Sequence, residues 1–277
     1  MGLTYYCDVH RTNKNGEGFR ITYTLDGLTF GHADGFGEIP AEAGDRVFVD
    51  TIPLQHTEGV MKLLRRGVEI YYLRRLTLIS RKREELRLSK TARNDVKALM
   101  IIGERWFRRV TEDFLVMRRM VAAYRSLLKT HKQLVNKSKA LSYLERYVAK
   151  PAIKALEEQM CELAERIAEE AGRRFPVYNK LVEGLGIRDS LAAMEAVAEL
   201  VVYIDLANSP LRGLKKLLGL YKPVRSRRKR HSRLYNGQLR RALDRLAMAH
   251  YGTIPNGRLC WMLARRIKEL STPQTQG

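Results

Sequence analysis

The chain has 277 residues, 45% of them apolar, which is enough to bury one large core or several small ones. Its formal net charge is +21 and its isoelectric point about 10.1, values that favour a polyanionic partner, above all nucleic acid. No apolar run reaches the roughly 18–20 residues of a membrane span, and the three cysteines form no CxxC pair for zinc. The first residues do not resemble a secretion signal, so we expect an intracellular, cytoplasmic protein.

The charge is unevenly distributed along the chain. Residues 1–60 contain four Lys/Arg against nine Asp/Glu, so the excess of cationic side chains lies entirely downstream. An acidic segment in a nucleic-acid-binding protein needs an explanation. Carboxylates that hold a divalent cation would supply one.

The first 80 residues predict an α/β domain with a mixed sheet of about five strands. The strands are expected at 4–10, 19–27, 28–37, 45–52 and 68–73, where β-prone runs alternate with turn signals. Asp26-Gly27 predicts a tight turn in a hairpin. A helix at about 55–66, closed by Gly67, separates the last two strands and predicts a parallel crossover. From residue 76 onward, strand signals almost disappear.

A seven-residue apolar period characterises residues 112–171. Apolar side chains recur at every seventh position from Met120 to Val148, and at steps of three and four from Ile153 to Ile167. Pro151 is expected to break or kink the helix between these stretches. Two arrangements satisfy the pattern: a long antiparallel coiled-coil hairpin that packs on itself, or an arm through which two chains form a homodimer or higher oligomer.

From Gly172 onward, the sequence predicts an all-helical region. Its apolar patterns indicate several amphipathic helices, with a break at Ser209-Pro210 and two final helices in NGQLRRALDRLAMAHYG and GRLCWMLARRIKEL. The predicted domains are therefore an α/β domain at 1–108, a coiled-coil hairpin at 109–172 and a basic helical domain at 173–277.

Three aspartates are the candidate metal ligands. Asp8 lies within an apolar strand, where a carboxylate is costly unless it is paired or metal-bound. Asp50 closes a strand expected to be buried, and Asp95 begins a helix. Hard divalent cations such as Mg²⁺ prefer oxygen ligands of this kind. The alternative is that Asp95 is an ordinary acid at a helix N-terminus and Asp50 a turn residue.

A glycine-rich turn and a basic run are the candidate nucleic-acid-binding segments. Gly184 and Gly186, in EGLGIRDSLAAM, fit a helix-hairpin-helix turn whose amides approach a phosphate, although a plain interhelical turn gives the same letters. Seven Lys/Arg occur among residues 222–233, without an acid, and indicate a phosphate-binding loop or a solvated charge run. The candidate contacts are Gly184, Gly186, Lys222, Arg225, Arg227, Arg228, Lys229, Arg230, Arg233 and Arg240.

Two serines, Ser226 and Ser232, lie within the basic run. Serine among arginines sits where a phosphodiester would dock, which is the setting of a phosphoryl-transfer nucleophile. Most serines in such segments only form hydrogen bonds.

The order of these parts resembles the DEDD-type insertion-sequence transposases, the RNA-guided recombinases. The resemblance covers about residues 3–250 and rests on the acidic strands, the run KTARNDVKAL at 90–99, the heptad segment, GLGI, LLGLYKP and NGQLRRAL. It implies an RNase H-like (RuvC-like) N-terminal domain with four acids that bind Mg²⁺. It also implies a C-terminal helical domain whose serine attacks DNA, and partners that are DNA and a structured RNA.

Carried over to this chain, the resemblance assigns three acids and one nucleophile. Asp8 matches the first acid, Asp50 stands where the family has Glu, and Asp95 matches the fourth acid. Ala92 replaces the third acid, and Ser226 stands at about the position of the nucleophile, followed by Arg rather than Gly. The resemblance implies a Mg-dependent DNA transposase or recombinase. The alternative is a catalytically degenerate member that acts as a non-enzymatic RNA- or RNP-binding scaffold.

Overall fold

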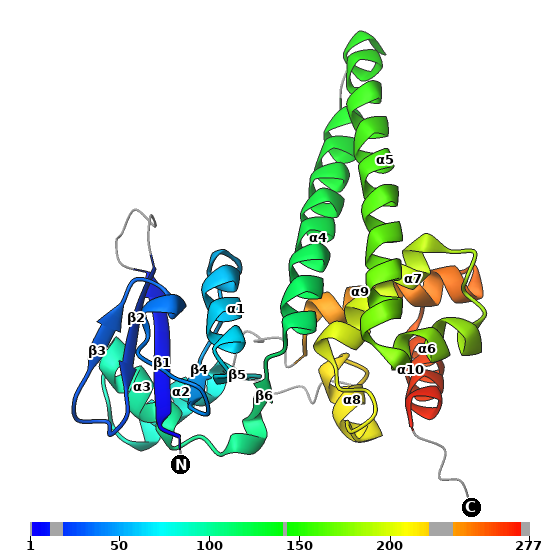
Figure 1. Ribbon diagram of the computed structural model, residues 1–277. Coiled ribbons are helices and arrows are strands. Elements are labelled where there is room, and N and C mark those ends of the chain that lie inside the picture. Colours follow the sequence, from blue (N-terminus) through cyan, green and yellow to red (C-terminus); the bar gives the residue numbers. More distant parts are fainter. Residues whose placement is uncertain (1, 12–18, 141–142, 222–234, 273–277) are drawn as a thin grey trace, which may run out of the picture. The chain divides into compact units, whose positions relative to one another are not determined.

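The computed structural model describes residues 2–11, 19–140, 143–221 and 235–272 of the chain (Figure 1). The candidate residues Lys222 to Arg233, with Ser226 and Ser232, lie outside this part. The chain divides into two compact units, Met1–Val116 and Met117–Gly277. The first combines a sheet with helices and the second is helical, so the predicted α/β N-terminal region followed by a helical C-terminal region is confirmed.

A single mixed sheet forms the centre of the first unit, with the strand order β3-β2-β1-β4-β5-β6. Strand β1 pairs antiparallel with β2 and parallel with β4, while β4 and β5 are also parallel. The strands are β1 (Thr4–Arg11), β2 (Phe19–Thr24), β3 (Gly31–Ala33), β4 (Arg46–Val49), β5 (Glu69–Leu73) and β6 (Phe107–Arg109). The parallel crossover between β4 and β5 is thereby confirmed, with α1 (Thr57–Arg65) between the two strands.

Short turns and helices connect the strands. The loop between β2 and β3 is longer than a tight turn: Asp26 Oδ1 accepts hydrogen bonds from the amides of Leu28 and Thr29, and Gly27 has φ of +76°. Gly67 closes the α1 segment with φ of +86°, a conformation that favours glycine. Short 3₁₀ helices lie at Phe36–Glu38, Leu54–His56 and Glu104–Trp106.

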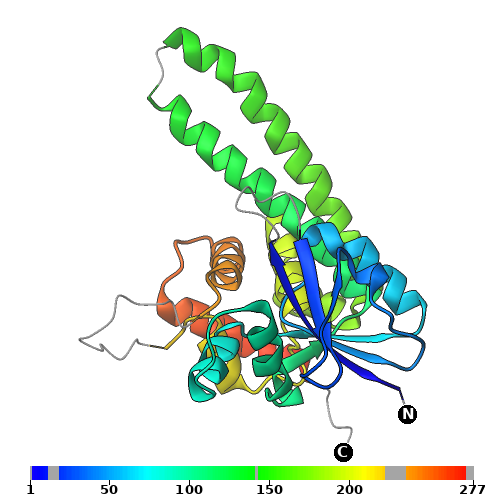
Figure 2. The ribbon, with the colours of Figure 1, turned by 90° about the vertical axis from the view of Figure 1, so that its left-hand side faces the viewer.

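Helices cover both faces of the sheet. Because side chains alternate along a strand, Phe48 of β4 faces one side and its neighbours Val47 and Val49 face the other. Phe48 belongs to a core with Ile79 of α2 (Thr77–Glu85) and Leu99 of α3 (Ala92–Met100). Figure 2 shows α1 across the sheet from α2 and α3.

The sixth strand, β6, was missed by the sequence prediction. It has only three residues, two of them arginines, so it carries no apolar alternation. It is held at the sheet edge because Phe107 is buried and packs edge-on against Phe48, with 4.9 Å between the ring centroids. Leu73 pairs with Phe107 across the antiparallel ladder.

Two long helices, α4 (Glu112–Ser138) and α5 (Tyr143–Arg174), form an antiparallel hairpin and lie side by side in both views (Figures 1 and 2). His131 Nε2 lies 3.0 Å from Glu157 Oε1 and ties the helices together. Pro151 does not break the helix, because it lies inside α5 and α4 ends at Ser138 instead, while a kink at Pro151 stays a prediction. Proline removes one backbone donor, but a long helix with tertiary support tolerates this.

The remaining helices are α6 (Pro176–Leu185), α7 (Leu191–Tyr203), α8 (Leu211–Leu217), α9 (Gly237–Tyr251) and α10 (Gly257–Ser271). Among them, α7 is buried along most of its length and contacts α5, α6 and α9, while α10 contacts α6, α8 and α9. The order of these helices agrees with the predicted helical stretches, and the break at Ser209-Pro210 separates α7 from α8. Across the described ranges, no helix combines the length and apolarity needed to cross a bilayer.

Candidate functional site

Asp8 and Asp50 lie side by side because their strands are parallel neighbours. Asp8 is in the middle of β1, on the same face as Tyr6, which stacks on Phe48. Asp50 follows the last residue of β4, where its backbone amide donates to Cys7 O at 3.3 Å. The amide of Val9 in turn donates to Asp50 Oδ1 at 3.0 Å. Both aspartates are buried, with 6% and 8% of their surface exposed.

Asp95 approaches the same place from α3, which contacts β1 and β2. Thr91 begins this helix by accepting a hydrogen bond from the amide of Asn94, and Asp95 is in the first turn. Its side chain is 17% exposed. The structure therefore brings the three predicted aspartates together from three separate elements.

The three carboxyl groups influence one another electrostatically. Burial raises the pKa of Asp8 to about 7, and the negative charge of Asp95 adds to that effect. Burial also raises the pKa of Asp50 well above its usual range, with a further contribution from Asp8. The pKa of Asp95 is raised by burial, although Arg83 and Lys90 counteract this. Excess negative charge in a buried site is thus partly relieved by protons.

Arg83 of α2 supplies a positive charge inside the cluster. Its Nε atom lies 2.6 Å from Asp95 Oδ1, and only 13% of the arginine side chain is exposed. The two atoms form an ion pair without the alignment of a hydrogen bond. Arg83 Nη2 is held by Ser80 Oγ at 3.3 Å, and His10 Nδ1 lies 3.3 Å from Asp8 Oδ2.

The cluster does not fit a magnesium ion in the arrangement that the residues adopt. One oxygen of each carboxylate already faces a backbone amide, a histidine or an arginine, whereas Mg²⁺ needs oxygens converging at ~2.0–2.1 Å. Within the described ranges, no group of three or more His, Cys, Asp or Glu side chains is placed to hold a metal ion. Ala92 stands one helical turn before Asp95 on the same face of α3, so this position adds no fourth carboxylate to the cluster.

The two glycines proposed for a phosphate-binding turn have structural roles. A Cβ atom on Gly184 would lie 2.6 Å from Leu270 Cδ2, so this glycine permits close packing of α6 against α10. Gly186 ends α6 with φ of +61°, and its amide donates to Glu183 O. The amide of Ile187 donates to Val182 O. These contacts account for both glycines, and a phosphate contact at this turn stays a prediction.

Arg240 is engaged within the protein. Its Nε atom donates to Asp244 Oδ1 at 2.8 Å, and Nη1 donates to Gly219 O at 3.3 Å. Its side chain is 22% exposed. The arginine therefore joins α9 to the end of the α8 segment, and its predicted contact with nucleic acid remains a prediction.

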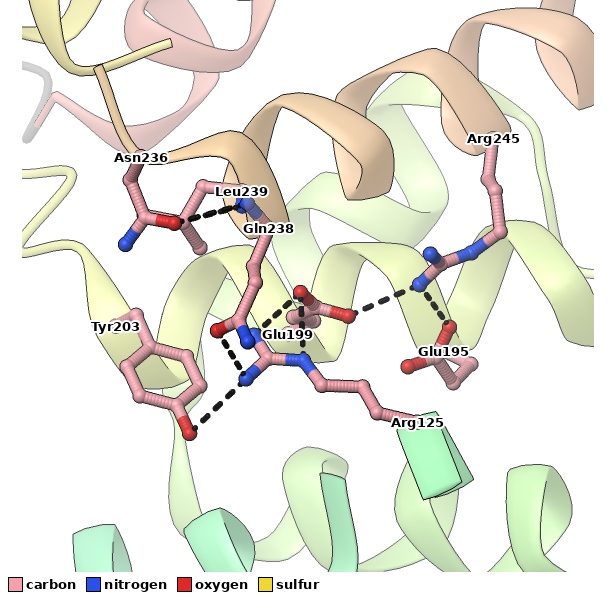
Figure 3. Close-up of polar contacts among 8 residues, drawn as sticks. All are labelled: Arg125, Glu195, Glu199, Tyr203, Asn236, Gln238, Leu239 and Arg245. Atoms are coloured by element: carbon pink, nitrogen blue, oxygen red, sulfur yellow. Dashed lines mark hydrogen bonds and ion pairs between the residues drawn. The ribbon is translucent and has the colours of Figure 1, made fainter. Parts of the chain in front are cut away.

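A second buried charge cluster, in the helical unit, was missed by the sequence prediction (Figure 3). Arg125 Nε of α4 donates to Glu199 Oε1 of α7 at 3.1 Å. Arg245 of α9 donates to Glu195 Oε2 at 2.6 Å and to Glu199 Oε2 at 2.9 Å. Gln238 accepts from Arg125 Nη1 at 2.8 Å. The sequence pattern that could have indicated this cluster is a pair of glutamates four residues apart in an otherwise apolar helix.

Both glutamates of this second cluster are buried, with side-chain exposures of 0% and 1% for Glu195 and Glu199. Burial raises the pKa of Glu195 to about 7, and the adjacent Arg245 guanidinium counteracts the rise. Burial likewise raises the pKa of Tyr124 to about 12. Two guanidinium groups face two carboxylates, so the cluster ties α4, α7 and α9 together, although Glu195 Oε1 and Arg245 Nε are buried without a hydrogen-bond partner in the described part of the chain.

Compared with known proteins, the chain matches no protein-family model and no curated sequence. The likeness to DEDD transposases therefore rests on residues of this chain alone. Of those residues, the structure unites the three aspartates and places Lys90, the first residue of the run at 90–99, near Asp8. It adds Arg83 and His10, neither of which the sequence singled out.

Proposed function

We propose that the protein binds nucleic acid, both DNA and structured RNA, as a non-enzymatic relative of the DEDD transposases with a RuvC-like N-terminal domain. The proposal is carried by a group of side chains around the carboxylate cluster, which we name the basic rim: the cationic Arg20, Lys90 and Arg93, together with the imidazoles of His10 and His32. The net charge of +21 supports the same kind of partner.

Electrostatic influence connects the members of the basic rim. Arg20, Arg93 and His10 all lower the pKa of His32, after the larger effect of burial. Lys90 lowers the pKa of Asp8. Arg20, Lys90 and Arg93 are exposed, so they are available to phosphate groups. Phosphate contacts of this kind give affinity without sequence specificity.

The arrangement of the sheet supports the RuvC-like assignment. The resemblance requires two acids on neighbouring strands and one on a following helix. Asp8 on the central strand β1, Asp50 at the end of β4 and Asp95 on α3 are consistent with that requirement. A protein whose partners are nucleic acids would also be intracellular, in agreement with the expected location.

Binding to the basic rim can be tested by fluorescence anisotropy with labelled single-stranded RNA and duplex DNA over a series of salt concentrations. We expect the affinity to fall as the salt concentration rises. Each lost phosphate contact lowers the slope of log K against log salt by ~0.7 for single strands. The double variant Lys90→Gln/Arg93→Gln should therefore lower that slope by about 1.4. The matched control is Lys62→Gln/Arg65→Gln on α1, across the sheet. Salt-independent binding, or equal effects of both double variants, would reject the proposal.

The second candidate function is Mg-dependent DNA cleavage and strand transfer, with Ser226 as nucleophile, and it requires Asp95 to leave Arg83. The observation that favours it is the convergence of Asp8, Asp50 and Asp95 from three elements. Incubating the protein with junction DNA, its co-purifying RNA and Mg²⁺ would then give a covalent protein–DNA adduct that Ser226→Ala abolishes. Tight RNA binding without an adduct would leave the non-enzymatic function in place.

We also propose that the hairpin mediates self-association with a second copy of the chain. Tyr147 and Val148 on α5 are each 71% exposed, and Val148 continues the heptad pattern. Light scattering on the full chain should show a dimer or larger species. The double variant Tyr147→Ser/Val148→Ser should shift it toward the monomer, and an unchanged mass would reject the role of this patch.

A further inference from the structure

The ion pair between Arg83 and Asp95 differs from an ordinary surface salt bridge. Its two side chains are only 13% and 17% exposed, and the approach is 2.6 Å. Solvent-exposed pairs contribute little because water and salt screen them. This pair instead lies beside two further buried carboxyl groups, and Arg83 lowers the pKa of both Asp8 and Asp95.

Local structure holds the arginine in this position. Leu88 N donates to Arg83 O at 2.9 Å, and Arg87 adopts φ of +55°, so the chain turns back directly after α2. Asn94 Nδ2 donates to Ser89 O at 3.0 Å and fastens the connection to the start of α3. The short, tied loop places α2 against α3, with Arg83 opposite Asp95.

The number of carboxyl groups in the cluster agrees with a single internal cation, Arg83. A cluster of four acids balances divalent metal ions, but Ala92 leaves only three carboxyl groups here. One guanidinium beside Asp95 carries less charge than a metal ion and suits the smaller acidic set. Guanidinium groups are weakly hydrated and remain charged when partly buried, which makes arginine better suited than lysine to this position.

We propose that Arg83 is a built-in cation that takes the place of a divalent metal ion beside Asp95 and closes the carboxylate cluster to metals. The arginine and the missing acid at position 92 then act together: one removes a ligand, and the other covers an oxygen of Asp95 that a metal would need. This inference does not depend on nucleic-acid binding, because metal affinity is measured on the protein alone.

The experiment uses Mn²⁺ as the probe and follows free Mn²⁺ by electron paramagnetic resonance during titration of the purified full chain. Four proteins form a factorial set: the wild type, Ala92→Asp, Arg83→Gln and the double variant Arg83→Gln/Ala92→Asp. We expect the wild type and Ala92→Asp to bind weakly and the double variant to bind at least about tenfold more tightly, comparable to the effect of groups that orient metal ligands. Arg83→Gln alone should fall between them.

Two further variants locate the effect. Arg81→Gln, an exposed arginine on the same helix α2, removes the same charge and should leave Mn²⁺ binding unchanged. Asp95→Asn, added to the double variant, should abolish the gained binding. A gain that survives Asp95→Asn, or an equal gain in Arg81→Gln, would overturn the assignment because the ion would lie elsewhere or respond only to net charge.

The set remains decisive if Arg83→Gln fails to fold. Ala92→Asp retains the arginine and adds the missing acid, so tight Mn²⁺ binding by this variant, lost on Asp95→Asn, would show that Arg83 is no barrier and would overturn the proposal. Tight Mn²⁺ binding by the wild type, if Asp95→Asn abolishes it, would also overturn the proposal. Weak binding by both supports it.

Discussion

The molecule contains two buried clusters of charge that differ in balance. In the helical unit, Glu195 and Glu199 meet two arginines, Arg125 and Arg245. In the N-terminal unit, three carboxyl groups meet one arginine, Arg83. Burial raises the pKa of an acid in each cluster to about 7, so the environments are similar, and the number of internal cations is what separates them.

The difference indicates what each cluster is for. A balanced cluster, with equal numbers of carboxylates and guanidinium groups, fixes the relative positions of helices, although its stabilisation is modest because both partners lose water. An acid-rich cluster is costly to maintain and is seldom explained by folding alone. Substitutions in each cluster test this comparison, and their expected effects decrease from the first to the last.

The largest effect should come from breaking the balanced cluster. Arg245→Met leaves two buried glutamates with one arginine, and we expect a loss of about 3–5 kcal/mol in the free energy of unfolding at pH 7. Urea unfolding measures it. Arg241→Met, exposed on the same helix, is the control and should change stability by less than about 0.5 kcal/mol. Equal losses would contradict a structural role for the cluster.

In the acid-rich cluster, removing an acid should stabilise the protein. The pKa of Asp8 is raised to about 7, so the folded state binds a proton that the unfolded state releases, and stability falls as pH rises from about 4 to above 7. Asp8→Asn removes this penalty and should raise the unfolding free energy by roughly 2–4 kcal/mol at pH 8, and by little at pH 4.

The control for that substitution is Asp34→Asn, an exposed aspartate of the same unit, which should change the unfolding free energy by less than about 0.5 kcal/mol. A loss of stability in Asp8→Asn at pH 8 would mean that the ionised carboxylate is well compensated. That result would remove the contrast between the two clusters.

Removing the single arginine of the acid-rich cluster should have a smaller effect than removing Arg245. Arg83→Met leaves Asp95 unpaired, but its raised pKa shows that a proton can neutralise it. We expect a loss of about 1–3 kcal/mol at pH 8, declining toward pH 4 as Asp95 becomes protonated. Thermal unfolding across this range measures the decline, and a loss independent of pH would indicate packing rather than charge.

The smallest effect should come from an exposed ion pair. Arg188 and Glu183 are 69% and 60% exposed, respectively. Replacing Arg188 with Gln should change the unfolding free energy by at most about 0.5 kcal/mol, because solvent screens the pair. A loss comparable to that of Arg245→Met would show that burial is not what distinguishes the clusters.

Much of the fold could be predicted because its signals are local. The turn of the chain at Gly67, the end of a strand before Asp50 and the apolar period from Ile153 to Ile167 each depend on residues a few positions apart. Strand β6 could not be predicted in this way. Its residues gain their partners only from β5 and from Phe48, far away in the sequence.

The same distinction applies to the candidate site. The residue types and spacing of Asp8, Asp50 and Asp95 marked them as candidates, since a carboxylate in an apolar strand or at a strand end is costly without a partner. Arg83 was overlooked because it stands in a basic stretch whose several arginines cannot be distinguished by sequence alone. Only the turn after α2 selects one of them to face Asp95.

The sequence by itself determined the strong positive charge and the α/β-then-helical organisation, because composition and periodicity follow directly from the residues. The tertiary structure alone decided which charges meet. Arg125 and Glu199 are 74 positions apart, and their contact exists because the fold brings α4 and α7 close enough for these side chains to meet. Electrostatic energy depends on distance and burial in space, and neither can be read from separation along the chain.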